Sequence, residues 1–142
     1  MQTVPIASDH AGFQLKQFLI NSLNSEFTFN DLGTHSGESV DYPDFAHKVA
    51  NLIENKTCEK GILICGSGNG VAITANKHTD VRAALCWNVE IAQLARLHND
   101  ANIVVFPARF IDFEEAKNCI KTFFSTPFEG GRHEQRIQKI NV

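Results

Sequence analysis

A cysteine followed by a glycine-rich loop is the feature of this sequence with the clearest chemical potential. An apolar run ends in Cys65, and glycine then occupies positions 66, 68 and 70. Because glycine has no Cβ, the backbone N–H groups of such a loop can approach an anion closely. If a helix begins near Gly70, its N-terminus favours the thiolate, which makes Cys65 a candidate base or nucleophile. Ser67 could donate a hydrogen bond to an oxyanion, or could only help to form the turn.

Other motifs and the overall charge narrow the choice of function. The spacing G-x-G-x-G departs from the dinucleotide fingerprint G-x-G-x-x-G, and no P-loop sequence is present. A net charge of −3 argues against a general nucleic-acid binder, which would need basic residues to neutralise phosphates. Cys58, Cys86 and Cys119 form no C-x-x-C pair with each other or with Cys65, so we expect reduced, mostly buried thiols, without disulfides or structural zinc.

Several polar side chains could assist the cysteine. His98 ends a helical pattern on the same face as Ile91 and Leu94, so we expect it to face inward or across an interface. It could shuttle protons, or it could simply be stabilised by the helix dipole. Asp9 and His10, which follow the first expected strand, could bind a ligand or only form a turn before a helix.

Arginines near the end of the chain suggest an anionic ligand. Arg132 and Arg136 are four residues apart and share one face if their segment is helical. Such a pair is often a solvated surface, but guanidinium groups also bind a phosphate dianion well. The remaining histidines show no metal-ligand spacing, so the sequence predicts no metal site.

The elements that must position these residues alternate along a single domain, residues 1–142. Expected strands cover residues 4–7, 27–32, 62–64, 82–85 and 103–106, and expected helices cover residues 13–23, 44–54, 89–98 and 113–124. This alternation predicts an α/β protein, a Rossmann-like or flavodoxin-like three-layer sandwich with a five-stranded parallel sheet. Ligands of such sheets bind beyond the carboxyl ends of the strands. Asp9, His10, the Cys65 loop and Arg109 are therefore expected to share one crevice.

Hydropathy along the chain predicts a cytoplasmic protein. No apolar run approaches the roughly 20 residues that cross a bilayer. The first residues also lack the basic segment and long apolar stretch of a secretory signal.

Six ordered motifs resemble the ribose-5-phosphate isomerase B family, which also includes allose-6-phosphate and galactose-6-phosphate isomerases. They are SDHAG at 8–12, DYP at 41–43, GILICGSGNG at 61–70, ANK at 75–77, QLARLHNDAN at 93–102 and EGGRH at 129–133. The resemblance implies interconversion of ribose 5-phosphate and ribulose 5-phosphate through an enediolate, in the non-oxidative pentose phosphate pathway, without a metal or redox cofactor.

The resemblance also implies a role for each matching residue. Cys65 would be the base that moves a proton between C1 and C2, and Ser67, where many members carry threonine, would bind the enediolate oxygen. His98 would assist ring opening, with Asp9 as its partner at the sugar hydroxyls. The other implied substrate contacts are His10, Tyr42, Gly66, Gly68, Asn69, Gly70, Asn99, Arg109, Arg132 and Arg136. The family builds its sites between subunits, which implies a homodimer or a tetramer of two dimers, with no nucleic-acid or membrane partner.

Three other functions stay open at this point. An allose-6-phosphate or galactose-6-phosphate isomerase would use the same chemistry, although the presence of Cys65 favours a self-sufficient homo-oligomer acting on a pentose phosphate. A cysteine hydrolase or transferase would use Cys65 as nucleophile and His98 as base, and would be recognised by a trapped acyl intermediate. A flavodoxin-like binding module would be recognised by a bound flavin or nucleotide.

Overall fold

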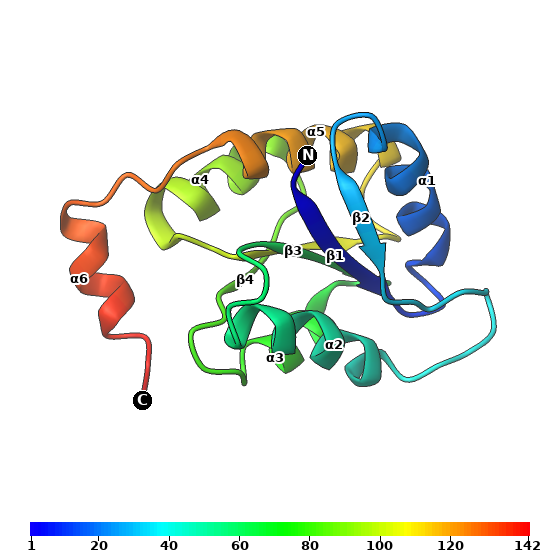
Figure 1. The fold of residues 1–142 in the computed structure, drawn as a ribbon, viewed down its shortest axis with the longest axis horizontal. Coiled ribbons are helices and arrows are strands. Elements are labelled where there is room, and N and C mark those ends of the chain that lie inside the picture. The colour runs from blue at the N-terminus through cyan, green and yellow to red at the C-terminus, as the bar shows by residue number, and fades with distance from the viewer.

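The computed structural model describes all 142 residues and has a five-stranded parallel sheet at its centre (Figure 1). The strands are β1 (Thr3–Ser8), β2 (Thr28–Asp31), β3 (Gly61–Cys65), β4 (Ala83–Leu85) and β5 (Ile103–Pro107). The helices are α1 (Phe13–Leu23), α2 (Tyr42–Glu54), α3 (Asn69–Ala75), α4 (Val89–Asn99), α5 (Phe113–Ser125) and α6 (Arg132–Gln138). The expected α/β three-layer sandwich is therefore confirmed.

Helices cover both faces of the sheet. Figure 1 shows α1, α4 and α5 above it and α2 and α3 below it. Ile62 and Ile64 of β3 belong to the core on the first side, whereas Leu63 and Cys65 belong to the core on the second. Both faces of the strand are thus buried, as is usual for a parallel sheet between two helix layers.

The strand order is β2-β1-β3-β5-β4. The chain passes from β1 to one neighbour, β2, and then crosses to the other neighbour, β3. This reversal opens a crevice beyond the carboxyl ends of β1 and β3, where ligands of such sheets bind. The last two strands are exchanged relative to the flavodoxin order 2-1-3-4-5. As a result, β4 is an edge strand paired only with β5.

An ion pair between a buried lysine and a partly exposed aspartate links the end of β2 to α1. Lys16 is fully buried and its Nζ lies 2.8 Å from both carboxylate oxygens of Asp31. Asp31 Oδ1 also accepts a hydrogen bond from the Gly33 N–H, at 3.0 Å. Because an unpaired buried charge is strongly destabilising, this pair holds the loop that leaves β2 towards α2.

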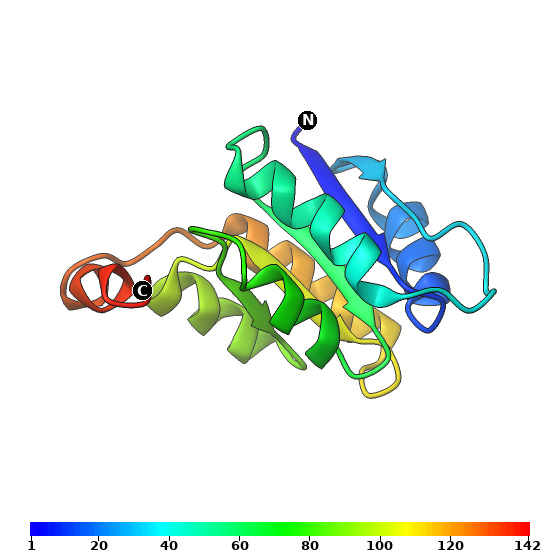
Figure 2. The same cartoon turned by 90° about the horizontal axis from the view of Figure 1, so that it is seen from below.

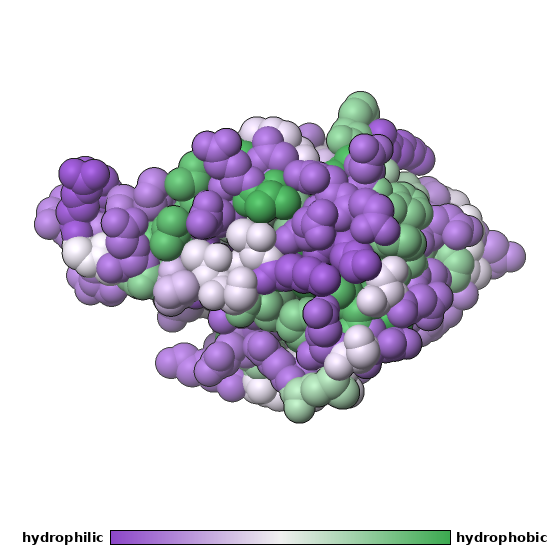
Figure 3. Space-filling view, turned by 90° about the horizontal axis from the view of Figure 1, so that it is seen from above, coloured by the Kyte–Doolittle hydropathy of each residue, from purple (hydrophilic) through white to green (hydrophobic).

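The C-terminal helix α6 stands away from the sheet. It lies beyond the end of α4 in both ribbon views (Figures 1 and 2) and none of its residues is buried. Figure 3 shows the same end of the molecule as mainly hydrophilic. Arg132 and Arg136 are both exposed on this helix. Their segment is helical, so the two arginines, four residues apart, share one face of α6. None of the helices combines the length and the apolar character needed to span a membrane.

Candidate active site

A crevice of about 420 Å³ lies at the carboxyl edge of the sheet. It is lined by Asp9, His10, Ala11, Tyr42, Cys65, Gly66, Ser67, Gly70, Arg109 and Phe110. These residues follow β1, β3 and β5 or begin α2 and α3. The expectation that Asp9, His10, the Cys65 loop and Arg109 share one crevice is confirmed.

Cys65 lies where β3 ends and the glycine loop begins. Its side chain is buried, and α3 starts four residues later at Asn69. Gly68 makes the turn with φ = +79°, a left-handed conformation that favours glycine, and a Cβ there would lie 2.4 Å from Leu85 Cδ1. The Asn69 N–H donates to Ser67 Oγ at 3.3 Å, so Ser67 does support the turn. Since Oγ is the acceptor in that bond, the Ser67 O–H stays available as a donor to a ligand.

The other three thiols lie in surroundings that oppose ionisation. Burial, together with the nearby Cys119, raises the pKa of Cys86 to about 12. Burial, together with the Glu115 carboxylate, raises the pKa of Cys119 to about 12. Burial also raises the pKa of Cys58. As a thiolate is the reactive form of cysteine, these three residues are packing residues and Cys65 is the thiol placed for chemistry.

Asp9 and His10 are held in defined orientations beside the thiol. Asp9 is buried, and its Oδ1 accepts a hydrogen bond from the Gly12 N–H at 3.1 Å. His10 Nδ1 accepts a hydrogen bond from the Val40 N–H at 3.2 Å. A nitrogen that accepts carries no proton, so the neutral His10 ring has its proton on Nε2 and can donate it to a ligand oxygen.

Arg109 and Tyr42 form two walls of the crevice. The Arg109 N–H donates to the Gly66 carbonyl at 3.0 Å, and a Cβ on Gly66 would lie 3.1 Å from Arg109 Nη1. The Tyr42 ring covers Gly70 so closely that a Cβ there would lie 2.4 Å from a ring carbon. A side chain at either glycine would therefore displace a wall residue. The crevice thus combines a cationic wall with an aromatic one.

Two residues that line the crevice were not predicted from the sequence, and two predicted residues of the glycine loop do not line it. Ala11 and Phe110 carry no polar group, and their only signal is that they adjoin His10 and Arg109 in sequence. Gly68 and Asn69 belong to the loop but not to the crevice wall.

The remaining predicted residues lie at the other end of the sheet. Cys65 pairs with Pro107 at the carboxyl end of β5, whereas α4 ends just before Ile103, at the amino end. Asn99 lines a separate hollow of about 490 Å³, between the end of α4, β4 and the C-terminal residues. His98 keeps 42% of its side-chain surface exposed, so the expectation that it faces inward is wrong, and the alternative that it faces an interface stays a prediction.

The arginines of α6 also lie apart from the crevice. Arg132 and Arg136 are absent from its lining, and α6 packs beside α4. A single chain thus brings together the thiol, Asp9, His10 and Arg109, and leaves the α4 and α6 residues outside.

The fold and the crevice together define a class of protein, a parallel α/β enzyme with a thiol, a carboxylate, an imidazole and a guanidinium around one small crevice. Residues 4–140 match the family model described as Ribose/Galactose Isomerase, and the chain belongs to this family. The resemblance seen in the six motifs is confirmed, and the chain is an isomerase.

Relatives and solved structures agree with this assignment over the full chain. Ribose-5-phosphate isomerase B of Escherichia coli is 39% identical over 143 residues, which cover 100% of this chain and 96% of that protein. The crystal structure of a ribose 5-phosphate isomerase from Thermotoga maritima is 50% identical with a TM-score of 0.96, covering 99% and 97% of the two chains. Ribose-5-phosphate isomerase B from Mycoplasma genitalium with bound ribulose-5-phosphate is 41% identical with a TM-score of 0.92, covering 97% and 93%.

Proposed function

We propose that this protein interconverts ribose 5-phosphate and ribulose 5-phosphate, as a cytoplasmic enzyme of the non-oxidative pentose phosphate pathway. The observation that carries the proposal is the placement of Cys65 beside Asp9, His10 and Arg109 in one crevice. A thiolate suits the removal of a carbon-bound proton, and the groups around it suit a phosphorylated sugar. Full-length similarity to ribose-5-phosphate isomerases supports the same substrate.

The reaction needs only proton transfers between positioned groups. The Cys65 thiolate removes the C2 proton of the open-chain aldose, and the electron pair moves through C1 to O1 to form an enediolate. The Ser67 hydroxyl and the loop N–H groups stabilise the negative charge on oxygen, which is where such donors have their largest effect. A proton then passes from O2 to O1, and the Cys65 thiol returns its proton to C1 as the C2=O bond forms, which leaves a ketone at C2.

We further propose that the complete site forms between two copies of the chain. Gly61 and Cys65 are four residues apart in β3, about 13 Å along a strand, and α4 ends near the amino end of that strand. A proton-transferring group must approach to within about 3 Å of the reacting atom. His98 can therefore reach a substrate bound at Cys65 only if it comes from a second chain. In this homodimer, His98 and Asn99 complete the sugar site and Arg132 and Arg136 bind the phosphate.

The test compares kcat/KM for ribose 5-phosphate and allose 6-phosphate under reducing conditions without added metal. We expect a strong preference for the pentose in the wild type and no isomerisation by Cys65→Ala, which should still bind the sugar phosphate. The matched control is Cys58→Ala, which removes a thiol outside the crevice and should keep full activity. Preference for the hexose would keep the mechanism and change the substrate. Undiminished turnover by Cys65→Ala would refute the mechanism.

A further inference from the structure

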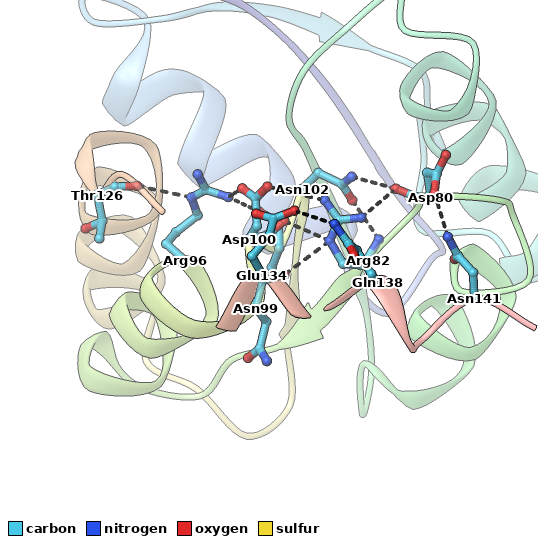
Figure 4. Close-up of polar contacts among 11 residues, drawn as sticks. Asp80, Arg82, Arg96, Asn99, Asp100, Asn102, Thr126, Glu134, Gln138 and Asn141 are labelled. Carbon is cyan, nitrogen blue, oxygen red and sulfur yellow. Dashed lines mark hydrogen bonds and ion pairs between the residues drawn. The ribbon is translucent and has the colours of Figure 1, made fainter. Parts of the chain in front are cut away.

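The end of α4 lies between two arginines, and Asp100 links them (Figure 4). Asp100 Oδ1 accepts a hydrogen bond from Arg96 Nη1 at 2.8 Å, and Asp100 Oδ2 lies 3.5 Å from Arg82 Nη2. Asp100 also ends the helix, with φ = +45°, a left-handed conformation that few residues other than glycine adopt. It directly follows His98 and Asn99, the two residues that α4 is proposed to supply to a second chain. The Asp100 carboxylate therefore lies where it can fix the direction in which these two side chains leave the helix.

Arg96 is anchored inside the protein. Its side chain is only 7% exposed, and its guanidinium carbon lies 5.7 Å from the centre of the Phe123 ring of α5. Its Nε donates to the Thr126 carbonyl at 3.1 Å, and its Nη1 also donates to the Ala101 carbonyl at 2.6 Å. Because these contacts tie Arg96 to the end of α5 and to the residue after Asp100, its guanidinium is a fixed point for the Asp100 carboxylate.

Arg82 holds the same turn from the side of the sheet. It directly precedes β4, and its Nε donates to the carbonyls of Asn99 and Asp100, at 3.1 Å each. The last carbonyls of a helix have no partner within the helix, and here the Arg82 side chain satisfies two of them. The Arg82 Nη1 donates to the Asp80 carbonyl at 3.3 Å, and the Arg82 N–H donates to Asn102 Oδ1 at 2.7 Å. Arg82 is thus a second fixed point for the end of α4.

The His98 ring packs against the exposed C-terminal helix. It stacks on the ring of His133 in α6, with centroids 4.3 Å apart and planes inclined by 16°, and its Nε2 lies 3.8 Å from Glu129 Oε2. A turn at Gly130 and Gly131, with φ values of +76° and +59°, brings α6 to this position. Because α6 has no buried residue, the connection from His98 to the core runs back through the end of α4.

We propose that Asp100 is a positioning residue of the isomerase, which holds His98 and Asn99 in the orientation that the other chain of the dimer requires. The inference rests on the proposed function, in which these two residues complete the site of that chain. Without the carboxylate, the guanidinium groups of Arg82 and Arg96 lose the negative charge between them and repel each other, so the end of α4 should shift. A misplacement of about 1 Å in an active site can cost about 100-fold in rate.

The first experiment replaces Asp100 by asparagine and by glycine and measures kcat/KM for ribose 5-phosphate. Both replacements accept the left-handed conformation, so a loss shared by the two variants reports the missing carboxylate and not backbone strain. We expect kcat/KM to fall by about tenfold or more in each, and thermal melts establish that both are folded. The matched control is Asp80→Asn, at another exposed aspartate with φ = +63°, whose carboxylate accepts a hydrogen bond from Asn141, and it should keep full activity. Unchanged kcat/KM in the folded Asp100 variants would overturn the proposal.

A heterodimer distinguishes positioning from a general loss of structure. One chain carries Cys65→Ala and supplies the working His98, and the other carries His98→Asn and supplies the working Cys65, so the dimer has one intact site. Asp100→Asn in the Cys65→Ala chain should lower kcat/KM by about tenfold, whereas Asp100→Asn in the His98→Asn chain should change nothing. Equal losses from both placements would mean that Asp100 supports the fold or the dimer in general, and would overturn the positioning role.

Failure of the shared site would give a different result. The heterodimer would then be inactive without any change at Asp100, which would overturn the shared site and the positioning role with it. An active heterodimer that does not respond to Asp100→Asn in either chain would overturn the positioning role alone and leave the proposed reaction intact.

Discussion

A heterodimer carrying two different defects would test whether the active site is shared between chains. One chain carries Cys65→Ala and the other His98→Asn, so each homodimer has two defective sites. If the site takes Cys65 from one chain and His98 from the other, the heterodimer contains one intact site and one with both defects. With the two subunits related by two-fold symmetry, activity should therefore return to about half of the wild-type value per dimer.

The measurement needs the heterodimer in pure form. Co-expression with two different affinity tags and sequential purification isolates it, and the rate of ribulose 5-phosphate formation is compared with both parent homodimers. The control is a heterodimer carrying Cys65→Ala in both chains and His98→Asn in one, which should stay inactive. Activity of the test heterodimer no higher than that of its parents would refute the shared site. It would also require Cys65 and His98 to meet within one chain, contrary to their positions at opposite ends of the sheet.

Three further substitutions test individual contacts. Arg132→Ala should weaken substrate binding by about 1.5 to 3 kcal/mol, the contribution of a charge-assisted hydrogen bond, and unchanged affinity would make this arginine a simple surface residue. Lys16→Met should lower the free energy of unfolding in urea by about 2 kcal/mol because Asp31 loses its buried partner, and equal stability would mean that the ion pair contributes nothing net. Gly70→Ala should lower kcat/KM by about tenfold by displacing the Tyr42 ring. If that reason is right, adding Gly70→Ala to Tyr42→Ala should cause little further loss.

The repeating strand and helix pattern was predictable because each element obeys a local rule. Short apolar runs marked the strands, and three- and four-residue spacing marked the helices. The exchange of β4 and β5 was not predictable, since periodicity along one strand does not encode which neighbour it pairs with. Lys16 was missed as a core residue for a related reason, because lysine is usually exposed and only its pairing with Asp31 makes burial tolerable.

Half of the candidate site was predictable from the rule for parallel sheets. Asp9 and Arg109 follow strands and Cys65 is the last residue of one, and the carboxyl ends of neighbouring strands meet at one edge. The position of His98 did not follow from this rule, because a helix that returns antiparallel to the strands ends at the opposite edge. The contact between His98 and His133 was not predictable either, because it depends on a turn at two glycines outside the sheet.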